Sequence, residues 1–562
     1  MRVTKFAVVP LETGETSESE VRMHVMRIPK NERASIYVSR KPERFELPQK
    51  WEAWNGIRDG RKANRDDRCI QISKATNMFL GSENCLFLNV FVPKFKMPGP
   101  DAVRGLPPIE PPIKYPVFFF IHGGGYNVGG GDLYGNKFLV DENVILVTIN
   151  YRLGVLGFLN TGDGTVPGNM ALKDQVMALR WVQENIKYFG GDSSNVILCG
   201  ESAGAACVHF HMMSPMSKGY FSKAIMQSGT ALSPWAFNKS PLEKVKKLAK
   251  QLDLNGHFNN PHIPELVRDL KRMDAAALAA QRKDYEMMGD AQMIHFAPSA
   301  ESGPSNGNTF LTDSPTQLLY TGKLITEVPL VLGVNREEGL YRSVPILRSS
   351  TKLKALNDHW SQELPVHLMY KKESVPQHDD FAKSVRKFYF DGKSIPGHTA
   401  VARERLTNMI SDRLFMYPTR RTALIHRGIL KEQQHQIFLY CFSYKGDYSY
   451  MNGFEVSDTY GASHADELQY LFNQRIFYSK ISPGSEADSM IDKMVSLWSN
   501  FAKTGTPYYP GQFNPWLPMP STTEENGVVQ YFQIDKHDGM IPDPFQNRME
   551  FWDHLPSTSL VF

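Results

Sequence analysis

The chain contains 562 residues, of which 41% are hydrophobic, 22% charged and 11% aromatic. This is the composition of an ordinary globular protein, so disorder, collagen and coiled coil are excluded for the chain as a whole. Lys and Arg number 63 against 59 for Asp and Glu, a net charge of +4 without any block of like charge. We therefore expect neither nucleic acid nor an acidic membrane as a partner. At roughly 150 residues per domain, the length alone would allow three or four domains.

The hydropathy pattern indicates no membrane or targeting segment. The longest apolar runs, such as residues 117–121 and 144–147, are far shorter than the ~18 residues that cross a bilayer, so we expect no integral membrane segment. The apolar stretch at residues 6–9 stops at Pro10, before it reaches the ~7 to 15 residues of a signal-peptide core. We expect a cytoplasmic protein, with secretion as the alternative if an upstream signal has been removed.

The five cysteines are too few and too odd in number for a disulfide-built scaffold. Cys199, Cys207 and Cys441 lie in apolar stretches, where buried and inert thiols are expected. Cys69 and Cys85 lie in a polar segment and could form a disulfide, which would contribute roughly 3 kcal/mol but would stay open in a reducing cytosol. No Cys/His set has zinc spacing, so we predict neither a metal nor a cofactor.

Between about residues 115 and 230, short apolar runs alternate with amphipathic segments, which is typical of a largely parallel, buried sheet with connecting helices. Strands are predicted at residues 115–121, 144–150, 195–199, 223–227, 329–334 and 437–442. Apolar residues at helical spacing predict helices over 171–189, 468–472 and around Met490, Met494, Trp498 and Phe501. Core packing accounts for nearly all of these apolar residues.

A glycine-rich loop, His122-Gly123-Gly124-Gly125-Tyr126, follows the first predicted strand. It resembles the oxyanion loop of lipases and esterases, in which glycines let backbone N–H groups turn toward a reacting carbonyl. A phosphate-binding loop is the alternative, but neither G-x-G-x-x-G nor the Gly-Lys-Ser/Thr ending is present. The N–H groups of Gly124, Gly125 and Ala203 are our candidate oxyanion donors.

The segment Gly200-Glu201-Ser202-Ala203-Gly204 lies between a predicted strand and a helix-like run at residues 207–213. This is a Gly-x-Ser-x-Gly motif in the strand–turn–helix context that gives it meaning. Glycines at 200 and 204 would remove side-chain clashes from the sharp turn. Ser202 is therefore the candidate nucleophile, and it needs oxyanion donors, a base and an acid.

In this architecture the acid and then the base follow the serine along the chain, each beyond a later strand. His464, in the small-residue loop 461–467 beyond the strand at 437–442, is the candidate base. Glu337 and Glu338 both follow the strand at 329–334, and the pattern alone does not decide between them. Without the serine motif, each of these residues would be interpreted as a solvated loop residue.

Taken together, these motifs resemble the type-B carboxylesterases, the cholinesterase-like branch of the α/β-hydrolases, and in particular insect α-esterases and related detoxifying esterases. The resemblance runs from about residue 45 to 505 and rests on segments 82–90, 122–125, 150–154, 167–169, 174–175, 200–204 and 463–467. It implies an α/β-hydrolase fold, with a large, mostly parallel sheet flanked by helices and helical inserts that form a gorge. In this family the acid directly precedes a glycine, which selects Glu338.

The resemblance implies that Ser202 attacks an ester carbonyl, that His464 transfers the proton and that Glu338 orients the imidazole. It also implies a disulfide between Cys69 and Cys85. The expected function is that of a serine carboxylesterase for hydrophobic esters such as lipids, hormones, pheromones or xenobiotics, with Trp235 as a candidate acyl-pocket residue. The alternatives are a catalytically silent binding or adhesion protein of the same fold and a neutral-lipid lipase. The sequence does not indicate an oligomeric state.

Because residues 124, 202, 338 and 464 have to converge on one site, we predict a single domain over residues 1–562. Residues 1–44 form a divergent N-terminal segment, in which Arg27 replaces a glycine that is usual in the family. Asn84 stands where Asp is usual, and Met170 follows the segment 167–169. None of these departures touches the candidate triad.

Overall fold

The computed structural model describes residues 34–37, 39, 42–50, 67–73, 77–93, 114–254, 262–287, 296–302, 307–321, 325–429, 436–454, 459–474, 481–520 and 529–555. Most of the divergent segment 1–44, including Arg27, therefore lies outside the described residues.

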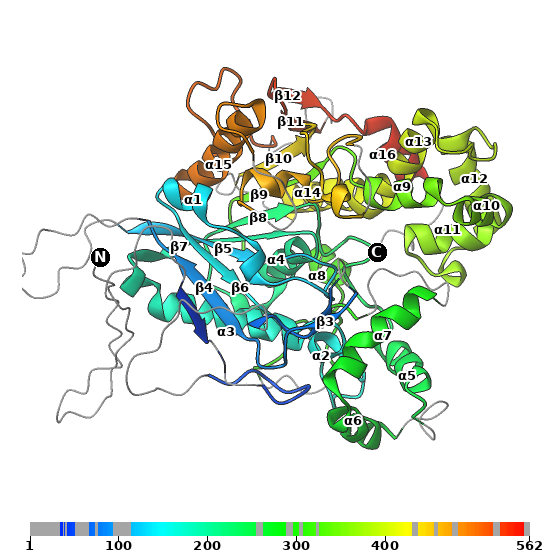
Figure 1. Ribbon diagram of the computed structural model, residues 1–562, viewed down its shortest axis with the longest axis horizontal. Coiled ribbons are helices and arrows are strands. Elements are labelled where there is room, and N and C mark those ends of the chain that lie inside the picture. Colours follow the sequence, from blue (N-terminus) through cyan, green and yellow to red (C-terminus); the bar gives the residue numbers. More distant parts are fainter. Residues whose placement is uncertain are drawn as a thin grey trace, which may run out of the picture.

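A ten-stranded sheet runs through the molecule in the order β1-β4-β6-β5-β7-β8-β9-β10-β11-β12 (Figure 1). Its neighbouring strands are parallel from β6 to β11, whereas β1, β4 and β12 pair in antiparallel fashion at the two edges. The strands are β1 (Ala34–Tyr37), β4 (Phe87–Phe91), β5 (Tyr115–Ile121), β6 (Ile145–Ile149), β7 (Gly191–Glu201), β8 (Lys223–Gln227), β9 (Leu330–Asn335), β10 (Ile437–Phe442), β11 (Gln530–Ile534) and β12 (Gly539–Pro542). A separate pair consists of β2 (Gln71–Ile72) and β3 (Phe79–Leu80).

The six predicted strands correspond to β5 through β10, and the α/β-hydrolase fold class is confirmed. The strands β1, β4, β11 and β12 were not predicted. All four lie at the edges of the sheet or beside an edge strand in antiparallel pairing, where the continuous apolar runs of a buried parallel strand are not required.

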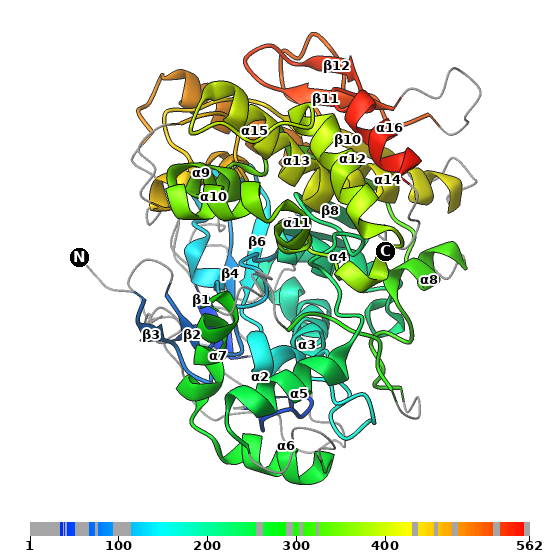
Figure 2. The same cartoon turned by 90° about the vertical axis from the view of Figure 1, so that its right-hand side faces the viewer.

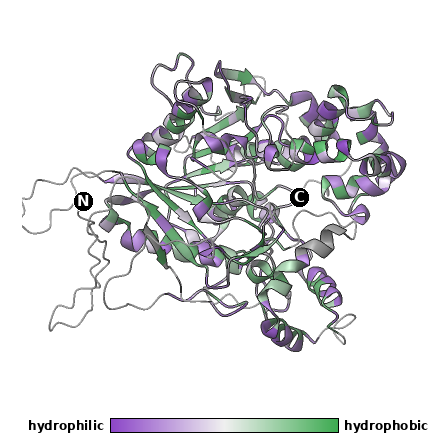
Figure 3. Ribbon diagram, viewed as in Figure 1, coloured by the Kyte–Doolittle hydropathy of each residue, from purple (hydrophilic) through white to green (hydrophobic). Residues whose placement is uncertain are grey.

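Helices cover both faces of the sheet, and the side chains of β5 alternate between the two layers. Val117, Phe119 and Ile121 belong to one hydrophobic cluster, and Phe118 and Phe120 belong to the other. The first cluster includes apolar residues of α3 and α4, whereas the second includes those of α15. Figure 3 shows the strands as predominantly hydrophobic, while the outlying helices α6 and α10 to α12 carry many hydrophilic residues. Because each face packs against its own hydrophobic cluster, the parallel sheet is buried on both faces.

The helices are α1 (Lys137–Asp141), α2 (Gly154–Phe158), α3 (Met170–Asn185), α4 (Ala203–Met213), α5 (Pro241–Gln251), α6 (Ile263–Arg272), α7 (Ala275–Met287), α8 (Pro315–Tyr320), α9 (Leu340–Arg348), α10 (Ser350–Asp358), α11 (Trp360–Leu368), α12 (His378–Phe390), α13 (Ala400–Ser411), α14 (Tyr417–Ile429), α15 (Glu486–Thr504) and α16 (Gln546–His554). The predicted helix at 171–189 is α3 followed by a 3-10 turn, and the predicted C-terminal helix is α15. The segment predicted as a helix at 468–472 is a short 3-10 helix, Asp466–Tyr470.

Helices α9 to α13 lie between β9 and β10 in the chain and form a group beside the sheet (Figures 1 and 2). The resemblance implies that inserts of this kind form a gorge. Within the described part of the chain, no helix combines the length and the apolar character needed to cross a bilayer.

Cys69 and Cys85 form a disulfide, as the resemblance implies, while Cys199, Cys207 and Cys441 are free and buried, as predicted. Burial raises the pKa of the Cys207 thiol to about 12. These free thiols are therefore inert core residues.

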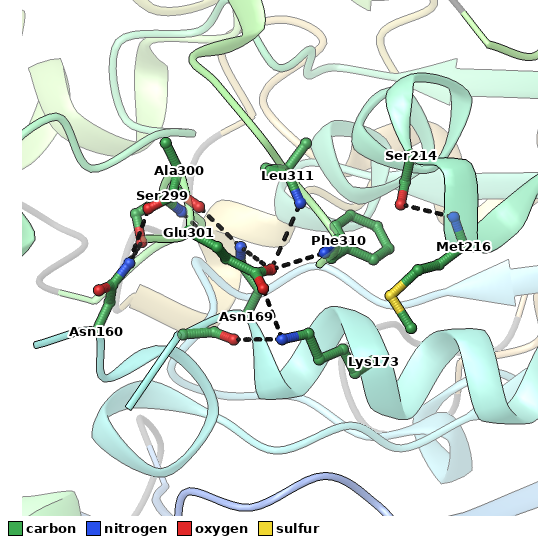
Figure 4. Close-up of polar contacts among 11 residues, drawn as sticks. Asn160, Asn169, Lys173, Ser214, Met216, Ser299, Ala300, Glu301, Phe310 and Leu311 are labelled. Atoms are coloured by element: carbon green, nitrogen blue, oxygen red, sulfur yellow. Dashed lines mark hydrogen bonds and ion pairs between the residues drawn. The ribbon is translucent and has the colours of Figure 1, made fainter. Parts of the chain in front are cut away.

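A buried ion pair holds the chain that follows α7 against the beginning of α3 (Figure 4). Lys173 Nζ lies 2.8 Å from Glu301 Oε2, and the two side chains are only 2% and 3% exposed. Glu301 Oε1 also accepts hydrogen bonds from Asn169 Nδ2 and from the backbone N–H of Phe310. The carboxylate is therefore fully engaged by one cation and by neutral donors.

We predict that Lys173→Met lowers the free energy of unfolding by about 3–5 kcal/mol, because it leaves the charge of Glu301 buried without its cation. Urea unfolding monitored by circular dichroism measures the change. The matched control is Lys50→Met, since the Lys50 and Glu184 side chains are 73% and 42% exposed. That change should cost less than about 1 kcal/mol. Equal decreases in the free energy of unfolding for the two variants would contradict the role of Lys173 as the buried cation that neutralises Glu301.

Candidate active site

Ser202 occupies a sharp turn between β7 and α4, with φ of 56° and ψ of −122°. A Cβ at position 204 would lie 2.0 Å from the carbonyl oxygen of Ile121, and one at position 200 would lie 2.4 Å from the Gly204 carbonyl. Only glycine fits at these two positions. The Ser202 N–H donates to the carbonyl oxygen of Gln227, at the end of β8, over 2.8 Å. The turn thus holds Ser202 at the carboxyl edge of the sheet.

Three predicted residues meet at this edge in a continuous line of hydrogen bonds. Ser202 Oγ lies 2.9 Å from His464 Nε2, and His464 Nδ1 lies 2.6 Å from Glu338 Oε2. Glu338 is fully buried, and its other oxygen accepts the Asn335 N–H over 2.8 Å. A carboxylate on Nδ1 favours the proton on that nitrogen, which leaves Nε2 of the neutral ring free to accept the serine proton.

The side chain of Glu337, the other candidate for the acid, contacts Ala462 and Arg336. Its Oε2 accepts the N–H of Ala462, and its Oε1 lies 3.7 Å from Arg336. Burial raises the pKa of Glu337 to about 6. The structure places Glu338, and not Glu337, against the imidazole, as the resemblance implied.

A second carboxylate, Glu201, lies on the other side of the histidine ring, 3.2 Å from His464 Nε2. Burial by itself lowers the pKa of His464, but the charges of Glu338 and Glu201 more than offset this and raise it to about 9. The two carboxylates therefore stabilise the imidazolium form of His464.

A second set of hydrogen bonds joins the turn at Ser202 to the segment that carries Asn335 and Glu338. Glu467 Oε1 accepts from Gln227 Nε2 over 3.0 Å, and Glu467 Oε2 accepts from Asn335 Nδ2 over 2.5 Å. The carbonyl of Gln227 holds Ser202, and the N–H of Asn335 holds Glu338. One fully buried carboxylate, Glu467, thus connects the supports of both groups.

Two of the predicted oxyanion residues, Gly124 and Gly125, have positive φ angles. Gly124 has φ of 104° and Gly125 has φ of 63°, both in the region that favours glycine. Asn127 Nδ2 donates to the Gly125 carbonyl over 2.7 Å, which fixes the direction of that peptide. Ala203 is the first residue of α4, where backbone N–H groups have no partner within the helix.

Aromatic rings surround the imidazole. The rings of Phe415 and Tyr341 lie 4.7 Å and 5.3 Å from that of His464, measured between centroids. Trp235 is buried, its Nε1 donates to the Leu414 carbonyl, and its ring lies 5.9 Å from Phe415. Leu414 and Phe415 belong to a π-helical turn, Asp412–Met416, between α13 and α14. Turns of this kind often occur at functional sites.

A small, open hollow adjoins the glycine loop. Asn127, which holds Gly125, lines it together with Gln71 and Gln281. The rest of the lining is mainly apolar and comes from β2, α2 and α7 and from the neighbouring chain: Ile70, Ile72, Leu153, Gly154, Val155, Leu156, Leu278, Ala279 and Phe296.

The sequence had not singled out several of the residues that complete this site. Glu201 and Glu467 lie inside motifs that were recognised, and their charge next to Ser202 and His464 was an available signal. Gln227, Asn335 and Phe415 carried no such signal, because their contacts are with residues that are distant in the chain.

The fold and the Ser-His-Glu arrangement define an α/β-hydrolase. The model of the carboxylesterase family matches residues 40–552, and the chain belongs to this family. The protein is therefore a carboxylic ester hydrolase.

Several known proteins are similar to most of the chain. Esterase E4 of Myzus persicae is 36% identical over 482 residues, 85% of this chain and 82% of that protein. Neuroligin-2 of Homo sapiens is 32% identical over 440 residues, 76% of this chain and 50% of that protein. The crystal structure of juvenile hormone esterase from Manduca sexta with OTFP covalently attached has a TM-score of 0.78 and 26% identity, and the match covers 98% of this chain and 99% of that one.

We predict that Glu201→Gln lowers the pKa of His464 from its value of about 9, because one of the charges that favour the imidazolium is lost. An NMR titration of histidine-labelled protein, with His464→Ala to assign the signal, measures the shift. Glu337→Gln is the control and should leave this pKa in place, since Glu337 is not among the groups that shift it. An unchanged titration in Glu201→Gln would exclude the proposed electrostatic effect.

Proposed function

We propose that the protein is a serine carboxylesterase that hydrolyses hydrophobic carboxylic esters through an acyl-enzyme on Ser202. The observation that carries this proposal is the line of hydrogen bonds from Ser202 Oγ through His464 to Glu338, with distances of 2.9 Å and 2.6 Å. This geometry supports proton removal from the hydroxyl by a neutral imidazole.

In the first half of the reaction, Ser202 Oγ attacks the ester carbonyl carbon and His464 Nε2 takes the serine proton. The tetrahedral intermediate carries its negative charge on the former carbonyl oxygen, for which the N–H groups of Gly124, Gly125 and Ala203 are the proposed donors. His464 then returns the proton to the alkoxide of the leaving alcohol as the C–O bond breaks, which leaves an acyl-serine.

In the second half, His464 removes a proton from a water molecule, and the resulting hydroxide attacks the acyl-serine. Collapse of the second intermediate releases the carboxylic acid and restores the Ser202 hydroxyl. Glu338 keeps the proton on Nδ1 throughout and stabilises the imidazolium that forms twice in each cycle.

The preference for hydrophobic esters is supported by the surroundings of the triad. Trp235 and Phe415 are buried aromatic residues near the site, and a Cβ at position 229 would contact both Trp235 Cη2 and the Ser202 carbonyl oxygen. We propose Trp235 as part of the acyl pocket, because Gly229 lies close to both its ring and the serine backbone.

The disulfide between Cys69 and Cys85 supports secretion over the expected cytoplasmic location. Disulfides persist in oxidising compartments and are rare in a reducing cytosol. We therefore propose an extracellular or secretory-pathway enzyme.

The similarity to neuroligin-2 favours one second candidate, a binding protein of the same fold. A binding function alone does not require Ser202, His464 and Glu338 to remain at hydrogen-bond distance, whereas ester hydrolysis does. A neutral-lipid lipase shares the proposed chemistry and differs only in the length of the acyl chain that it accepts. A series of p-nitrophenyl esters of graded chain length separates it from a short-chain esterase.

We predict that Ser202→Ala lowers kcat for p-nitrophenyl ester hydrolysis roughly 10⁶-fold, because the nucleophile is lost. In the unmodified enzyme, an organophosphate should attach to Ser202 and to no other residue, as shown by mass mapping of peptides. Ser202→Ala protein, treated in the same way, is the control. Labelling at another residue, or none, would count against the acyl-enzyme mechanism and in favour of a binding protein.

The two adjacent glutamates provide a matched test of the acid. We predict that Glu338→Gln lowers kcat roughly 10³- to 10⁴-fold, since an amide can stabilise the wrong imidazole tautomer and carries no charge. Glu337→Gln should have a far smaller effect, because Glu337 contacts Ala462 and Arg336 instead. Steady-state kinetics of both variants decides the matter. The reverse order of effects would assign the acid role to Glu337.

A further inference from the structure

The side-chain amide of Gln71 binds the backbone of the glycine-rich stretch 122–131. Gln71 lies on β2, inside the segment closed by the Cys69–Cys85 disulfide, and is only 4% exposed. Its Nε2 donates to the Gly129 carbonyl over 2.7 Å and to the Cys69 carbonyl over 2.9 Å, while its Oε1 accepts the Gly129 N–H over 2.8 Å. Both hydrogens and the oxygen of the amide are therefore used, and one side chain holds both backbone groups of Gly129.

The backbone of Gly129 lies directly against the beginning of the same stretch. Gly129 has φ of 123°, and a Cβ there would lie 2.3 Å from His122 Nδ1 and 2.8 Å from the Gly123 carbonyl oxygen. No side chain fits between these groups, so the position of Gly129 limits where His122 and Gly123 can lie.

The Gly123 carbonyl in turn sets the direction of the Gly124 N–H. His122 Nδ1 lies 2.8 Å from the Gly123 oxygen, and because a carbonyl only accepts, Nδ1 carries the proton. Burial lowers the pKa of His122 to about 4, so the ring is neutral near pH 7. The peptide between Gly123 and Gly124 is trans, so its N–H points away from its carbonyl. A contact that fixes this carbonyl therefore fixes the Gly124 N–H as well.

The chain that carries Gln71 is anchored to the glycine-rich stretch at a second point. Arg68 Nε and Nη2 donate to the two carboxylate oxygens of Asp132, which directly follows the stretch, over 2.8 Å and 2.7 Å. Cys69, between Arg68 and Gln71, is bonded to Cys85. Bidentate pairs of this kind add geometric specificity, so Gln71 is presented to the glycine-rich stretch from a fixed position.

We propose that Gln71 is a positioning residue for the oxyanion donors: by holding Gly129 against His122 and Gly123, it keeps the Gly124 N–H turned toward the reacting carbonyl. This inference rests on the proposed function, in which Gly124 is one of the donors. Donors that are fixed before the reaction need no reorganisation when the charge develops. A displacement of about 1 Å in such a site can cost roughly 10² in rate.

The test measures the stability of an oxyanion in the site, with a trifluoromethyl ketone that is isotopically labelled at the carbonyl carbon. Ser202 Oγ adds to this carbon, the carbonyl electron pair moves to the oxygen, and His464 takes the serine proton, which gives a hemiketal oxyanion. Carbon NMR at increasing pH then gives the pKa of the hemiketal hydroxyl. Weaker N–H donation disfavours the anion and therefore raises this pKa.

We predict that Gln71→Met, which keeps the length of the side chain and removes the amide, raises the pKa of the hemiketal by about one to two pH units. In the same variant, kcat/KM for p-nitrophenyl esters should fall roughly 10- to 100-fold, with KM changed less than about threefold. Gln71→Glu keeps an acceptor but, when ionised, donates to neither carbonyl, so it should raise the hemiketal pKa too. Only folded protein forms the hemiketal, so the measured pKa does not depend on the folded fraction.

Gln183→Met is the matched control. The Nε2 of Gln183 also donates to two backbone carbonyls, those of Ser193 and Tyr220, over 2.9 Å each. Ser193 lies near the beginning of β7, whereas Ser202 follows the end of that strand. Loss of this amide should leave both the hemiketal pKa and kcat/KM at the values of the unmodified enzyme.

A hemiketal pKa in the two Gln71 variants equal to that of the unmodified enzyme would overturn the role of Gln71, whatever the change in kcat/KM, and would leave the proposed esterase function intact. An equal rise of this pKa in Gln183→Met would overturn the role of Gln71 as well. If the unmodified enzyme hydrolyses no ester and forms no hemiketal, the proposed function is wrong and this inference is wrong with it.

Discussion

The strained backbone of Ser202 is the constraint on which the rest of the site depends. A non-glycine residue at φ of 56° and ψ of −122° is unfavourable and persists only where its surroundings impose it. The imposing contacts are the hydrogen bond from its N–H to Gln227 and the close approach of α4 to β5 at Gly204. This turn directs the hydroxyl away from the sheet and toward His464, so that all other groups are arranged around one point at the carboxyl edge.

The second constraint on the site is that several carboxylates are buried close to His464. Glu201, Glu338 and Glu467 are all buried near a single imidazole, and burial raises the pKa of Glu467 to about 7. Carboxylates are costly in this environment unless they accept hydrogen bonds, and Glu338 and Glu467 do so from Asn335, Gln227 and His464. The charge that raises the pKa of His464 stabilises the imidazolium, which is the form that the histidine adopts in both proposed transition states. The same charge holds the proton more tightly in the free enzyme, so activity is expected to increase with pH.

Much of this architecture was predictable from the sequence, because it rests on local patterns. The strands β5 to β10 are continuous apolar runs, and the glycines of the serine turn mark a place where side chains do not fit. The choice of Glu338 over Glu337 was not predictable from periodicity, since it depends on the direction of two adjacent side chains, and only the family resemblance supplied it. Phe415 was beyond prediction, because a π-helical turn places it against His464 and nothing in its local sequence indicates that turn.

The proposed catalytic residues follow strands of the sheet, whereas the proposed substrate contacts come from segments outside it. This difference explains why the reaction was easier to predict from the sequence than the substrate. Ser202 and Glu338 directly follow β7 and β9, where the parallel sheet fixes their spacing, and His464 lies in the chain that follows β10. The proposed substrate contacts come from outside that frame: Trp235 follows β8, and Phe415 lies in the insert between β9 and β10. These segments are joined to the sheet by packing and not by strand register, so their positions follow from long-range contacts such as the hydrogen bond from Trp235 Nε1 to the Leu414 carbonyl. Substitutions there can alter the proposed acyl pocket while the triad keeps its geometry, which is how one catalytic frame can serve esters of different shape.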